Sequence, residues 1–433
     1  MKSQKSSVKL NNWLLPILVG LVLLLQIFLP YKGWMALLVG LGGLWAISTY
    51  WAFSLRAKLS LTREMRFGWA QVGDRLIERF SLANDAALPA LWVEVEDLST
   101  LPGYRASRGT GVASRSSIRW HRESVCTRRG LFYLGPTNVR TGDPFGVYTV
   151  ALSYPASMPL LVLPPIVPLP PIEVAPGGRS GEGRPRANAL DRVISASGVR
   201  PYVPGDSRRW VHWKLSAHHQ ELYVRLFDGT PAGDWWILLD MDARVQVGVG
   251  ENSTDELGVI LAASLADRGL RARRAVGLVA HGEELVWLPP QSGEGQRWEI
   301  LRTLALVNRG RRSLAELLQR VQPTLGQRTT LIIITPAVEG PWLEKLVPLL
   351  RRGVVPTVLL LDPVSFGGSG SVAAARATLN QLGVANAVIT QDLLDHPLAH
   401  PGVQGHWEWK VLGTGKAVPV QRVASDTSWR SLA

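Results

Sequence analysis

The chain has 433 residues, 46% of them hydrophobic, and a formal net charge of +13. This length supports two or three domains with hydrophobic cores, while a single cysteine, Cys126, excludes an internal disulfide framework and suits a reducing compartment. The positive charge favours an acidic partner, namely anionic lipid head groups, nucleic acid or an acidic protein surface, but it does not choose among them.

Two apolar runs follow a polar N-terminal segment. They cover about residues 13–30 and 34–53, and neither contains an acidic or basic residue. Each is close to the roughly 20 residues that cross a bilayer core. Residues 1–58 are therefore predicted to form a short tail and a two-helix transmembrane hairpin, rather than a buried helical pair of a soluble core.

Basic residues flank the two runs unevenly. The loop between the runs offers only Lys32, whereas the outer flanks carry several cations. Because positive flanks remain on the cytoplasmic side, we predict an inner-membrane protein with two spans, with both termini and the main domains cytoplasmic. The outer cations are Lys2, Lys5, Lys9, Arg56, Lys58, Arg63 and Arg66.

Residues 59–165 contain short runs of strand-like composition, separated by turn signals. Repeated strands of this kind favour a small all-β domain that resembles a β-sandwich. The predicted strands cover residues 59–63, 76–80, 91–97, 117–120, 131–134 and 160–163.

Two features of this domain are interpreted as structural. The segment at 143–146 reads Asp-Pro-Phe-Gly and predicts a tight turn, and we expect Phe145 to plug one end of the sandwich. Cys126 lies in a strand-like context, which favours a buried small hydrophobic side chain over a nucleophile.

Residues 166–230 combine a linker with a central motif. The Pro- and Gly-rich first part is typical of a linker, and its basic portion does not match the spacing of a phosphate-binding P-loop. The motif that follows is the densest mixture of charged and aromatic residues in the chain. In it, Pro204-Gly205 predicts a type II turn, and Asp206 predicts the N-cap of a short helix at 207–214.

Trp210 and Trp213 fall three residues apart on this predicted helix, and we expect them to share a buried face while the cations point to solvent. Residues 221–227 then alternate in the manner of a half-buried strand.

Residues 231–412 alternate strand-like and helix-like segments, starting with the apolar run 235–240. This pattern favours an open, mostly parallel sheet with helices on both faces. Ser253 and Glu256 have the spacing of a capping box. Ligands bind such sheets at the carboxyl ends of the strands, which here carry Asp240, Thr335 and Asp362. Residues 413–433 are predicted to form a C-terminal tail. Helices are predicted at 253–268, 297–321, 342–352 and 371–382, and further strands at 275–280, 284–288, 330–335, 357–362 and 387–390.

A long ordered signature runs through the central motif: Arg200-Pro201-Tyr202-Val203-Pro204-Gly205-Asp206, Arg208, Trp213-Lys214 and Ser216-Ala217. It resembles the DUF58 family, a bacterial group of unknown function. Upstream, Arg128-Arg129-Gly130 and the 143–146 turn are similar to a further pattern of that family. The chain departs from the family at His212 and His218, where an acid and an arginine are usual.

The resemblance implies a layout of transmembrane helices, a small β domain and a von Willebrand A-like domain. It also implies a protein partner, a MoxR-type AAA+ ATPase, in the assembly or activation of other proteins at the envelope. The central motif is expected either to dock that partner or to fix the angle between the two domains. The residues expected to do so are Arg200, Tyr202, Pro204, Gly205, Asp206, Arg208, Trp213 and Lys214.

The von Willebrand A-like resemblance also directs attention to a metal site. Such domains often carry Asp-x-Ser-x-Ser after the first strand, with a later Thr and Asp completing a Mg²⁺ site. Here residues 240–244 read Asp-Met-Asp-Ala-Arg, and Thr335 has no acid beside it. We expect a degenerate site without a metal. Weak ion binding by Asp240 and Asp242 stays open, and an ion pair from these acids to Arg244 or to the central motif is the structural reading.

No catalytic spacing accompanies the histidines, and no cofactor is expected. The leading hypothesis is a non-enzymatic, membrane-anchored scaffold or adaptor. The alternative is a metal-dependent hydrolase acting on cell-wall or lipid precursors, which would need a divalent ion at Asp240 and Asp242. A nucleic-acid partner is not expected, because most of the 17 Trp residues alternate with apolar neighbours, as core or membrane-interface residues do. The client protein and the oligomeric state stay open.

Overall fold

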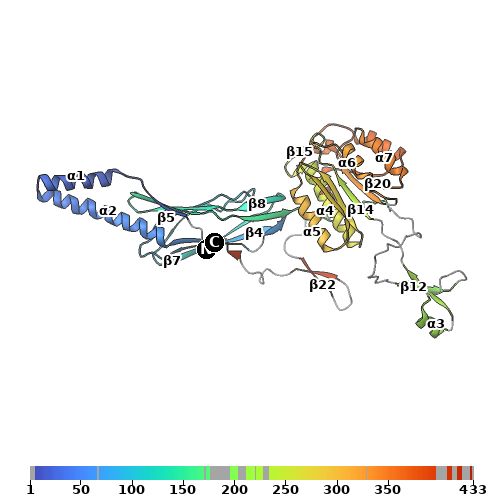
Figure 1. Ribbon diagram of the computed structural model, residues 1–433, viewed down its shortest axis with the longest axis horizontal. Helices are drawn as coiled ribbons and strands as arrows, with labels where there is room; N and C mark the ends of the chain where they lie inside the picture. The colour runs from blue at the N-terminus through green and yellow to red at the C-terminus, as the bar shows by residue number, and fades with distance from the viewer. Residues whose placement is uncertain are drawn as a thin grey trace. The chain divides into compact units, whose positions relative to one another are not determined.

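The structure is a computed structural model that divides into two compact units, each described by itself (Figure 1). Unit 1 consists of Met1–Pro168, Leu301–Leu306 and His400–Ala433, and unit 2 of Leu169–Ile300 and Val307–Ala399. The structure describes residues 5–65, 68–169, 172–175, 196–202, 211–219, 221–227, 234–327, 329–395, 407–411, 417–421 and 430–431.

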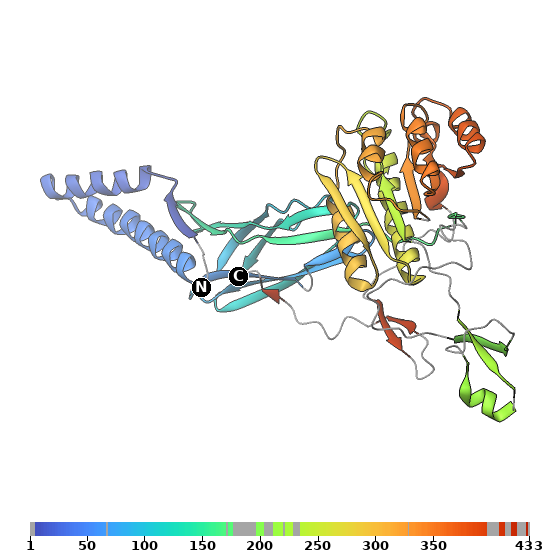
Figure 2. The same cartoon turned by 45° about the vertical axis from the view of Figure 1, so that its right-hand side comes forward.

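Unit 1 begins with a strand and two apolar helices. Helix α1 (Leu14–Phe28) and helix α2 (Lys32–Lys58) lie side by side and are joined by a short connection (Figures 1 and 2). With 27 residues, α2 is long and apolar enough to cross a membrane. Helix α1 has 15 residues and is shorter than the predicted run at 13–30.

The C-terminal half of α2 packs on the β domain of the same unit. The indole Nε1 of Trp45 donates to the Tyr148 hydroxyl at 2.9 Å, and that of Trp51 donates to the Pro89 carbonyl at 2.9 Å. Further along, Ala52 and Leu55 are completely buried in the hydrophobic core. The predicted span at 34–53 is therefore free of the β domain only over its first part.

A short tail was predicted for the N-terminal segment, but the structure shows a strand there. Strand β1 (Lys5–Leu10) pairs antiparallel with β10 (Tyr148–Tyr154), with Leu10 opposite Tyr148. Its side chains alternate between exposed and half-buried positions, because one face of the strand covers the domain. Lys5 and Lys9 lie on the exposed face.

The β domain contains a five-stranded sheet, a four-stranded sheet and a three-stranded sheet, in the orders β1-β10-β9-β5-β6, β24-β2-β4-β7 and β3-β11-β8. All six predicted strands are present, whereas β1, β3, β6, β9 and β10 were not predicted. The remaining bounds are β2 (Leu59–Met65), β3 (Trp69–Gln71), β4 (Arg75–Asn84), β5 (Ala90–Asp97), β6 (Arg108–Val112), β7 (Ser116–Val125), β8 (Gly130–Leu134), β9 (Thr137–Gly142), β11 (Met158–Leu163) and β24 (Arg430–Ser431).

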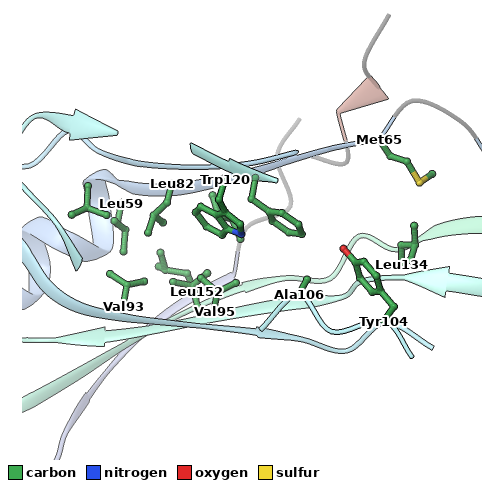
Figure 3. Close-up of a cluster of buried hydrophobic side chains, with 14 of the residues drawn as sticks. Leu59, Met65, Leu82, Val93, Val95, Tyr104, Ala106, Trp120, Leu134 and Leu152 are labelled. Atoms are coloured by element: carbon green, nitrogen blue, oxygen red, sulfur yellow. The ribbon is translucent and has the colours of Figure 1, made fainter. Parts of the chain in front are cut away.

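One hydrophobic core lies between these sheets, which makes the domain a β-sandwich (Figure 3). Leu82 and Val95 come from different sheets and are both completely buried. Phe80 and Trp120 stack with ring centroids 5.4 Å apart. Cys126 is buried as predicted, and burial, aided by the charge of Asp74, raises the pKa of its thiol to about 11.

A buried ion network crosses this core. The Arg63 guanidinium donates to both carboxylate oxygens of Glu78 at 2.9 and 2.7 Å, and to Asp97 at 2.7 Å. Its other hydrogen bonds go to Thr137 at 3.2 Å and to Ser99 at 3.0 Å. All five N–H groups of the guanidinium therefore have acceptors.

Glu78 is fully buried in this network. Burial raises the pKa of its carboxyl group, while hydrogen bonding and the charge of Arg63 act in the opposite direction. The Tyr104 hydroxyl also donates to Glu78, and the Arg63 guanidinium lies 5.1 Å from the centre of the Phe80 ring. Such a network is stable only while Arg63 and its acidic partners are all present, because removing one side leaves the other charge buried without a counter-charge.

The turn at 143–146 forms as predicted, but Phe145 does not plug the sandwich. Asp143 is buried instead, and its carboxylate accepts from the backbone N–H groups of Phe145 at 3.0 Å and Tyr148 at 2.6 Å. Phe145 is 54% exposed. The acid fills the role of an internal cap for the turn, which directs the ring outward.

Unit 2 is built on a six-stranded sheet in the order β18-β17-β14-β19-β20-β21. All neighbouring pairs are parallel except β17 and β18. Counted along the chain, this is the order third, second, first, fourth, fifth, sixth, which is typical of a doubly wound sheet. The strands are β14 (Trp235–Leu239), β17 (Val276–His281), β18 (Leu285–Gln291), β19 (Thr330–Thr335), β20 (Val355–Leu361) and β21 (Ala385–Ile389).

Helices cover both faces of this sheet, as predicted. On one face, Gly258 of α4 approaches Leu239 so closely that an added Cβ would lie 3.1 Å from its Cδ1 atom. On the other face, Trp236 and Leu238 share a core with residues of α6, α7 and α8. The helices are α4 (Thr254–Arg271), α5 (Glu294–Leu306), α6 (Leu314–Val321), α7 (Trp342–Arg351) and α8 (Val372–Gln381).

Two local predictions for unit 2 are wrong. Ser253 precedes α4, but its hydroxyl donates to the Gly250 carbonyl and does not cap the helix. The single helix predicted at 297–321 is two helices, α5 and α6. Between them Gly310 pairs with the chain after β14 and approaches Gly282 too closely for any side chain.

Short elements complete the chain. The predicted tail at 413–433 contains two strands, β23 and β24. The remaining elements are the hairpin β15 (Gly248–Val249) and β16 (Asn252–Ser253), the 3₁₀ helices η2 (Pro363–Phe366) and η3 (Gln391–Asp395), and the pair β22 (Trp407–Val411) and β23 (Ala417–Gln421).

Replacing Arg63 by Met should destabilise the full-length protein by about 3–5 kcal/mol, because Glu78 and Asp97 would stay buried without their counter-charge. Burial already raises the pKa of Glu78, so the variant should fold with this group protonated. A raised pKa in the folded state loses stability as pH rises, so the deficit should be smaller in acidic than in alkaline buffer. Thermal unfolding in detergent measures both effects.

The matched control is Arg140→Met. Arg140 and Glu96 are exposed and 3.9 Å apart, and such a pair contributes about 0–1 kcal/mol. Equal losses from the two substitutions, or a deficit at Arg63 that does not depend on pH, would contradict the account of the buried network.

Candidate functional site

The carboxyl ends of β14 and β19 meet where the sheet of unit 2 reverses its winding direction. Strand β14 is the first strand of the sheet, and the chain runs from it to β17 on one side and later to β19 on the other. Open α/β sheets bind ligands at such a switch point. Asp240 and Thr335 occupy the two strand ends, so the sequence placed these two residues correctly.

Asp240 is 2% exposed, and both of its carboxylate oxygens accept hydrogen bonds. Its Oδ2 accepts from the Thr335 hydroxyl at 2.6 Å, and its Oδ1 accepts from the Asp242 backbone N–H at 3.1 Å. Burial raises the pKa of the Asp240 carboxyl to about 6, although both hydrogen bonds act to lower it. Each carboxylate oxygen of Asp240 thus accepts one hydrogen bond from within the chain.

Asp242 is paired with Arg244. The guanidinium donates through its Nε to both carboxylate oxygens, at 2.9 and 3.1 Å, and through a terminal nitrogen to Oδ2 at 2.7 Å. The Asp242 side chain is 5% exposed and that of Arg244 is 66% exposed. The ion pair expected from the sequence is therefore formed between Asp242 and Arg244. A bidentate guanidinium occupies the carboxylate that a metal would need.

A second set of polar residues supports this edge. Gln246 donates to the Asp240 carbonyl at 2.8 Å and accepts from the Thr254 hydroxyl at 2.6 Å. Arg309 donates to Asp255 at 2.7 Å. Burial acts to raise the pKa of Asp255, but the hydrogen bond from Arg309 and its charge hold the pKa below its usual range.

Sequence reasoning missed these supporting residues. Arg309 and Asp255 are 54 positions apart in the chain, and no spacing pattern connects them. Only Gln246 and Thr254 lie close enough to the Asp240 segment for a local search to have found them.

A cavity of about 590 Å³ opens at the same edge of the sheet, beyond the ends of β20 and β21. Its polar groups include two acids, Glu251 and Asp392, and Thr390 donates to Asp392. Val249 at the tip of the β15–β16 hairpin is 90% exposed. The residues lining the cavity are Glu251, Asn252, Leu257, Ser365, Phe366, Thr390, Gln391 and Asp392.

Asp362, also predicted at this edge, has a local role. It follows β20, and its carboxylate accepts from the Val364 backbone N–H at 3.1 Å as the cap of η2. Across the part of the chain that the structure describes, no three His, Cys, Asp or Glu side chains converge as a metal-binding group would.

The central motif forms a small module of its own. Strand β12 (Ala196–Pro201) pairs with β13 (Tyr223–Phe227), and helix α3 (Trp213–His219) connects them. The Tyr202 N–H donates to the Leu222 carbonyl at 2.7 Å. The hydroxyl of Ser216 accepts from the Tyr223 N–H at 2.9 Å, so this serine of the signature closes the module.

Two predictions for the motif need correction. The described helix spans Trp213–His219, and residues 211 and 212 of the helix predicted at 207–214 are not helical, while residues 207–210 lie outside the described residues. Trp213 is 66% exposed rather than buried. Arg200 lies in β12 and Lys214 in α3. Pro204, Gly205, Asp206, Arg208 and Trp210 lie outside the described residues.

Comparisons with solved structures give only weak likenesses. The VWA domain of SpRpn10 has a TM-score of 0.27 and 14% identity, over 40% of this chain and 99% of that one. The CARDB domain of the PF1109 protein from Pyrococcus furiosus has a TM-score of 0.18 and 10% identity, over 24% of this chain and 90% of that one. Scores this low carry no argument about function.

Two similar proteins have names that describe them as uncharacterized. Uncharacterized protein Rv1480 of Mycobacterium tuberculosis is 26% identical over 171 residues, 38% of this chain and 54% of that protein. Uncharacterized protein YeaD of Bacillus subtilis is 23% identical over 256 residues, 57% of this chain and 62% of that protein. The chain thus spans about half the length of the mycobacterial relative.

Residues 198–367 match the model of a family described as "Protein of unknown function DUF58". The matched range begins in the central motif and extends past the carboxyl ends of β14, β19 and β20. The signature from Arg200 to Ala217 lies inside this range, so residues 198–367 are the part of the chain that is similar to the DUF58 family.

Proposed function

We propose that this protein is a membrane-anchored scaffold whose doubly wound unit binds a protein partner. The observation that carries the proposal is the bidentate pair between Arg244 and Asp242 at the switch point. The Arg244 guanidinium engages the Asp242 carboxylate, on which metal binding would depend. This edge of the sheet then serves as a surface for binding a protein. The adjoining cavity and the exposed Val249 add shape and apolar area to that surface.

The anchor is supported by α2 and by the strands on either side of the helices. Strand β1 precedes α1 and β2 follows α2, and both belong to sheets of the same sandwich. The chain must therefore leave and re-enter the sandwich on one side of a bilayer, which requires an even number of crossings. Two crossings, by α1 and α2, satisfy this requirement.

Aromatic residues mark both ends of the proposed hairpin. Trp13 is 67% exposed at the start of α1, and Trp45 lies at the level where α2 meets the sandwich. At the other end, Tyr31 and Trp34 pack edge to face with ring centroids 6.5 Å apart. Trp and Tyr concentrate at membrane–water interfaces, so these pairs fit two interfacial belts.

A cytoplasmic position for the main domains is the orientation that we propose. Arg56 and Lys58 in the last turn of α2 and Lys5 and Lys9 on the exposed face of β1 lie on the sandwich side, against Lys32 alone in the connection. Arg63 was counted in the sequence argument, but it is buried among acids and contributes little net charge.

The partner that we propose is a MoxR-type AAA+ ATPase, in assembly or activation of other proteins at the envelope. Its support is the DUF58 region and the motif resemblance. The central motif presents the exposed indole of Trp213, which is a common type of interface anchor.

A metal-dependent hydrolase acting on cell-wall or lipid precursors is the second candidate. One observation favours it: Asp240 and Asp242 lie together at the switch point, with Thr335 beside them. It requires that Arg244 move away from Asp242 to admit an ion.

The scaffold proposal predicts a nucleotide-dependent contact at the carboxyl edge of the sheet. A photo-crosslinking residue at Val249, in the full-length protein in its native membrane, should capture an AAA+ ATPase more strongly in ATP than in ADP. Mass spectrometry of the crosslinked product identifies the captured protein.

Gln381 provides the matched control. It ends α8 at the opposite edge of the sheet and is exposed. Capture of the ATPase from both positions alike, or from neither across repeated preparations, would contradict docking at the carboxyl edge.

Mn²⁺ binding distinguishes the hydrolase candidate from the scaffold proposal. The wild-type protein should show no Mn²⁺ binding that depends on Asp242, whereas Arg244→Ser should gain weak binding, because a hydroxyl then replaces the cation. Titration calorimetry and Mn²⁺ resonance measure this difference.

Arg271→Ser is the control for that experiment. Arg271 is also exposed and pairs with a buried acid, Asp267, at 2.7 Å, so its loss should add no metal site. If the wild-type protein binds Mn²⁺ and Asp242→Asn abolishes that binding, the hydrolase would be preferred over the scaffold.

A further inference from the structure

The β9–β10 turn presents an aromatic ring to the outside. Asp143 is the one acid of residues 142–148, and it is buried with its carboxylate bonded to the N–H groups of Phe145 and Tyr148. Phe145 is 54% exposed. The turn therefore offers an apolar tip without an exposed negative charge.

Two more apolar side chains lie at the same end of the five-stranded sheet. Leu91 and Trp92, at the start of β5, are 56% and 42% exposed. The register places them beside the end of β9, since a Cβ added at Gly142 would lie 3.1 Å from the Trp92 ring. The Trp92 carbonyl accepts from the Thr141 hydroxyl at 2.6 Å, which fixes this neighbourhood.

This end of the sheet is also where the helices leave the sandwich. The Asn11 N–H donates to the Val147 carbonyl at 2.8 Å, only three residues before α1 begins. On the other helix, Trp45 donates to the Tyr148 hydroxyl. Figures 1 and 2 both show α1 and α2 extending from this end of the sandwich.

We propose that this tip, formed by Phe145, Leu91 and Trp92, inserts into the head-group region of the membrane. The proposal rests on the membrane anchoring proposed above, since the tip is continuous with the points where α1 and α2 enter the bilayer. Exposed aromatic and aliphatic side chains at that level gain by burial about 5–10 Å into the head-group and acyl boundary. Lys9, exposed opposite Thr149, adds a cation for anionic head groups.

Lipid is favoured as the occupant because of this position. The tip lies beside the points where both helices would enter the bilayer. Insertion of the helices would therefore already hold the tip against the bilayer surface, and the tip itself needs no additional binding energy to stay there. The 143–146 turn, whose Phe145 was expected to plug one end of the sandwich, then acts as a shallow second contact that restrains the tilt of the domain on its hairpin.

Site-specific fluorescence in vesicles tests the proposal with the full-length chain. In a Cys126→Ala background, single cysteines at three exposed positions are labelled with an environment-sensitive nitrobenzoxadiazole dye. The protein is reconstituted into phosphatidylcholine–phosphatidylglycerol vesicles, with a quencher either near the head groups or at the ends of the acyl chains. The positions are Phe145 at the tip, Leu37 in α2, which is 47% exposed, and Tyr133 in β8, which is 44% exposed.

Tyr133 is the negative control because it lies in another sheet, next to the far end of β5. Its carbonyl accepts from the Thr100 N–H, beyond the end of β5 at Asp97. Leu37 reports insertion of the hairpin. We expect blue-shifted emission and loss of fluorescence with the shallow quencher at Phe145, stronger loss with the deep quencher at Leu37, and neither effect at Tyr133.

The other outcomes separate the two proposals. Quenching at Leu37 without quenching at Phe145 would overturn the tip contact while the anchor stands, and would leave the tip to a protein partner. Equal quenching at Phe145 and Tyr133 would also overturn it, because the whole sandwich would then contact lipid without selectivity. Absence of quenching at Leu37 would overturn the anchor itself.

Discussion

The pairing of β1 with β10 is the constraint on which unit 1 depends. It ties the chain to the sandwich before the first helix, just as β2 ties it after the second. The hydrophobic core then includes Ala52 and Leu55 of α2 together with residues of the sheets. Helix α2 and the sandwich therefore share one core, so the sandwich does not move freely on α2 as it would on a flexible stalk.

At the switch point of unit 2, the chain's own groups satisfy the two acids Asp240 and Asp242. Arg244 satisfies Asp242 while Thr335 and a backbone N–H satisfy Asp240. Ionising Asp240 is unfavourable because of its burial, which is why its pKa is raised to about 6. The carboxylates of both acids are thus engaged by residues of this chain.

The sequence was informative where patterns are local. The six strands of the doubly wound sheet and the pairing of Asp242 with Arg244 follow from apolar runs and from charges two residues apart. It was uninformative where polar residues are buried by distant partners: β9 carries the buried Thr137 and Thr141 and does not read as a strand. Phe145 was assigned to the interior because it is aromatic, but the short carboxylate of Asp143 satisfied the turn and took that place. Arg63 was counted as a flanking cation because its partners Glu78 and Asp97 lie far away in the chain.

In the membrane anchoring proposed above, the lipid around the helical hairpin must adapt to the length of the hairpin. At about 1.5 Å per residue, the 15 residues of α1 extend about 22 Å, and α2 becomes part of the sandwich surface from Trp45 onward. A typical hydrocarbon core is about 30 Å thick. A hairpin this short is matched only where the bilayer thins around it or where flanking side chains reach toward the interface. Hydrophobic mismatch would then draw copies of this protein toward one another and toward thinner regions of the membrane, so lipid thickness would control where the protein gathers.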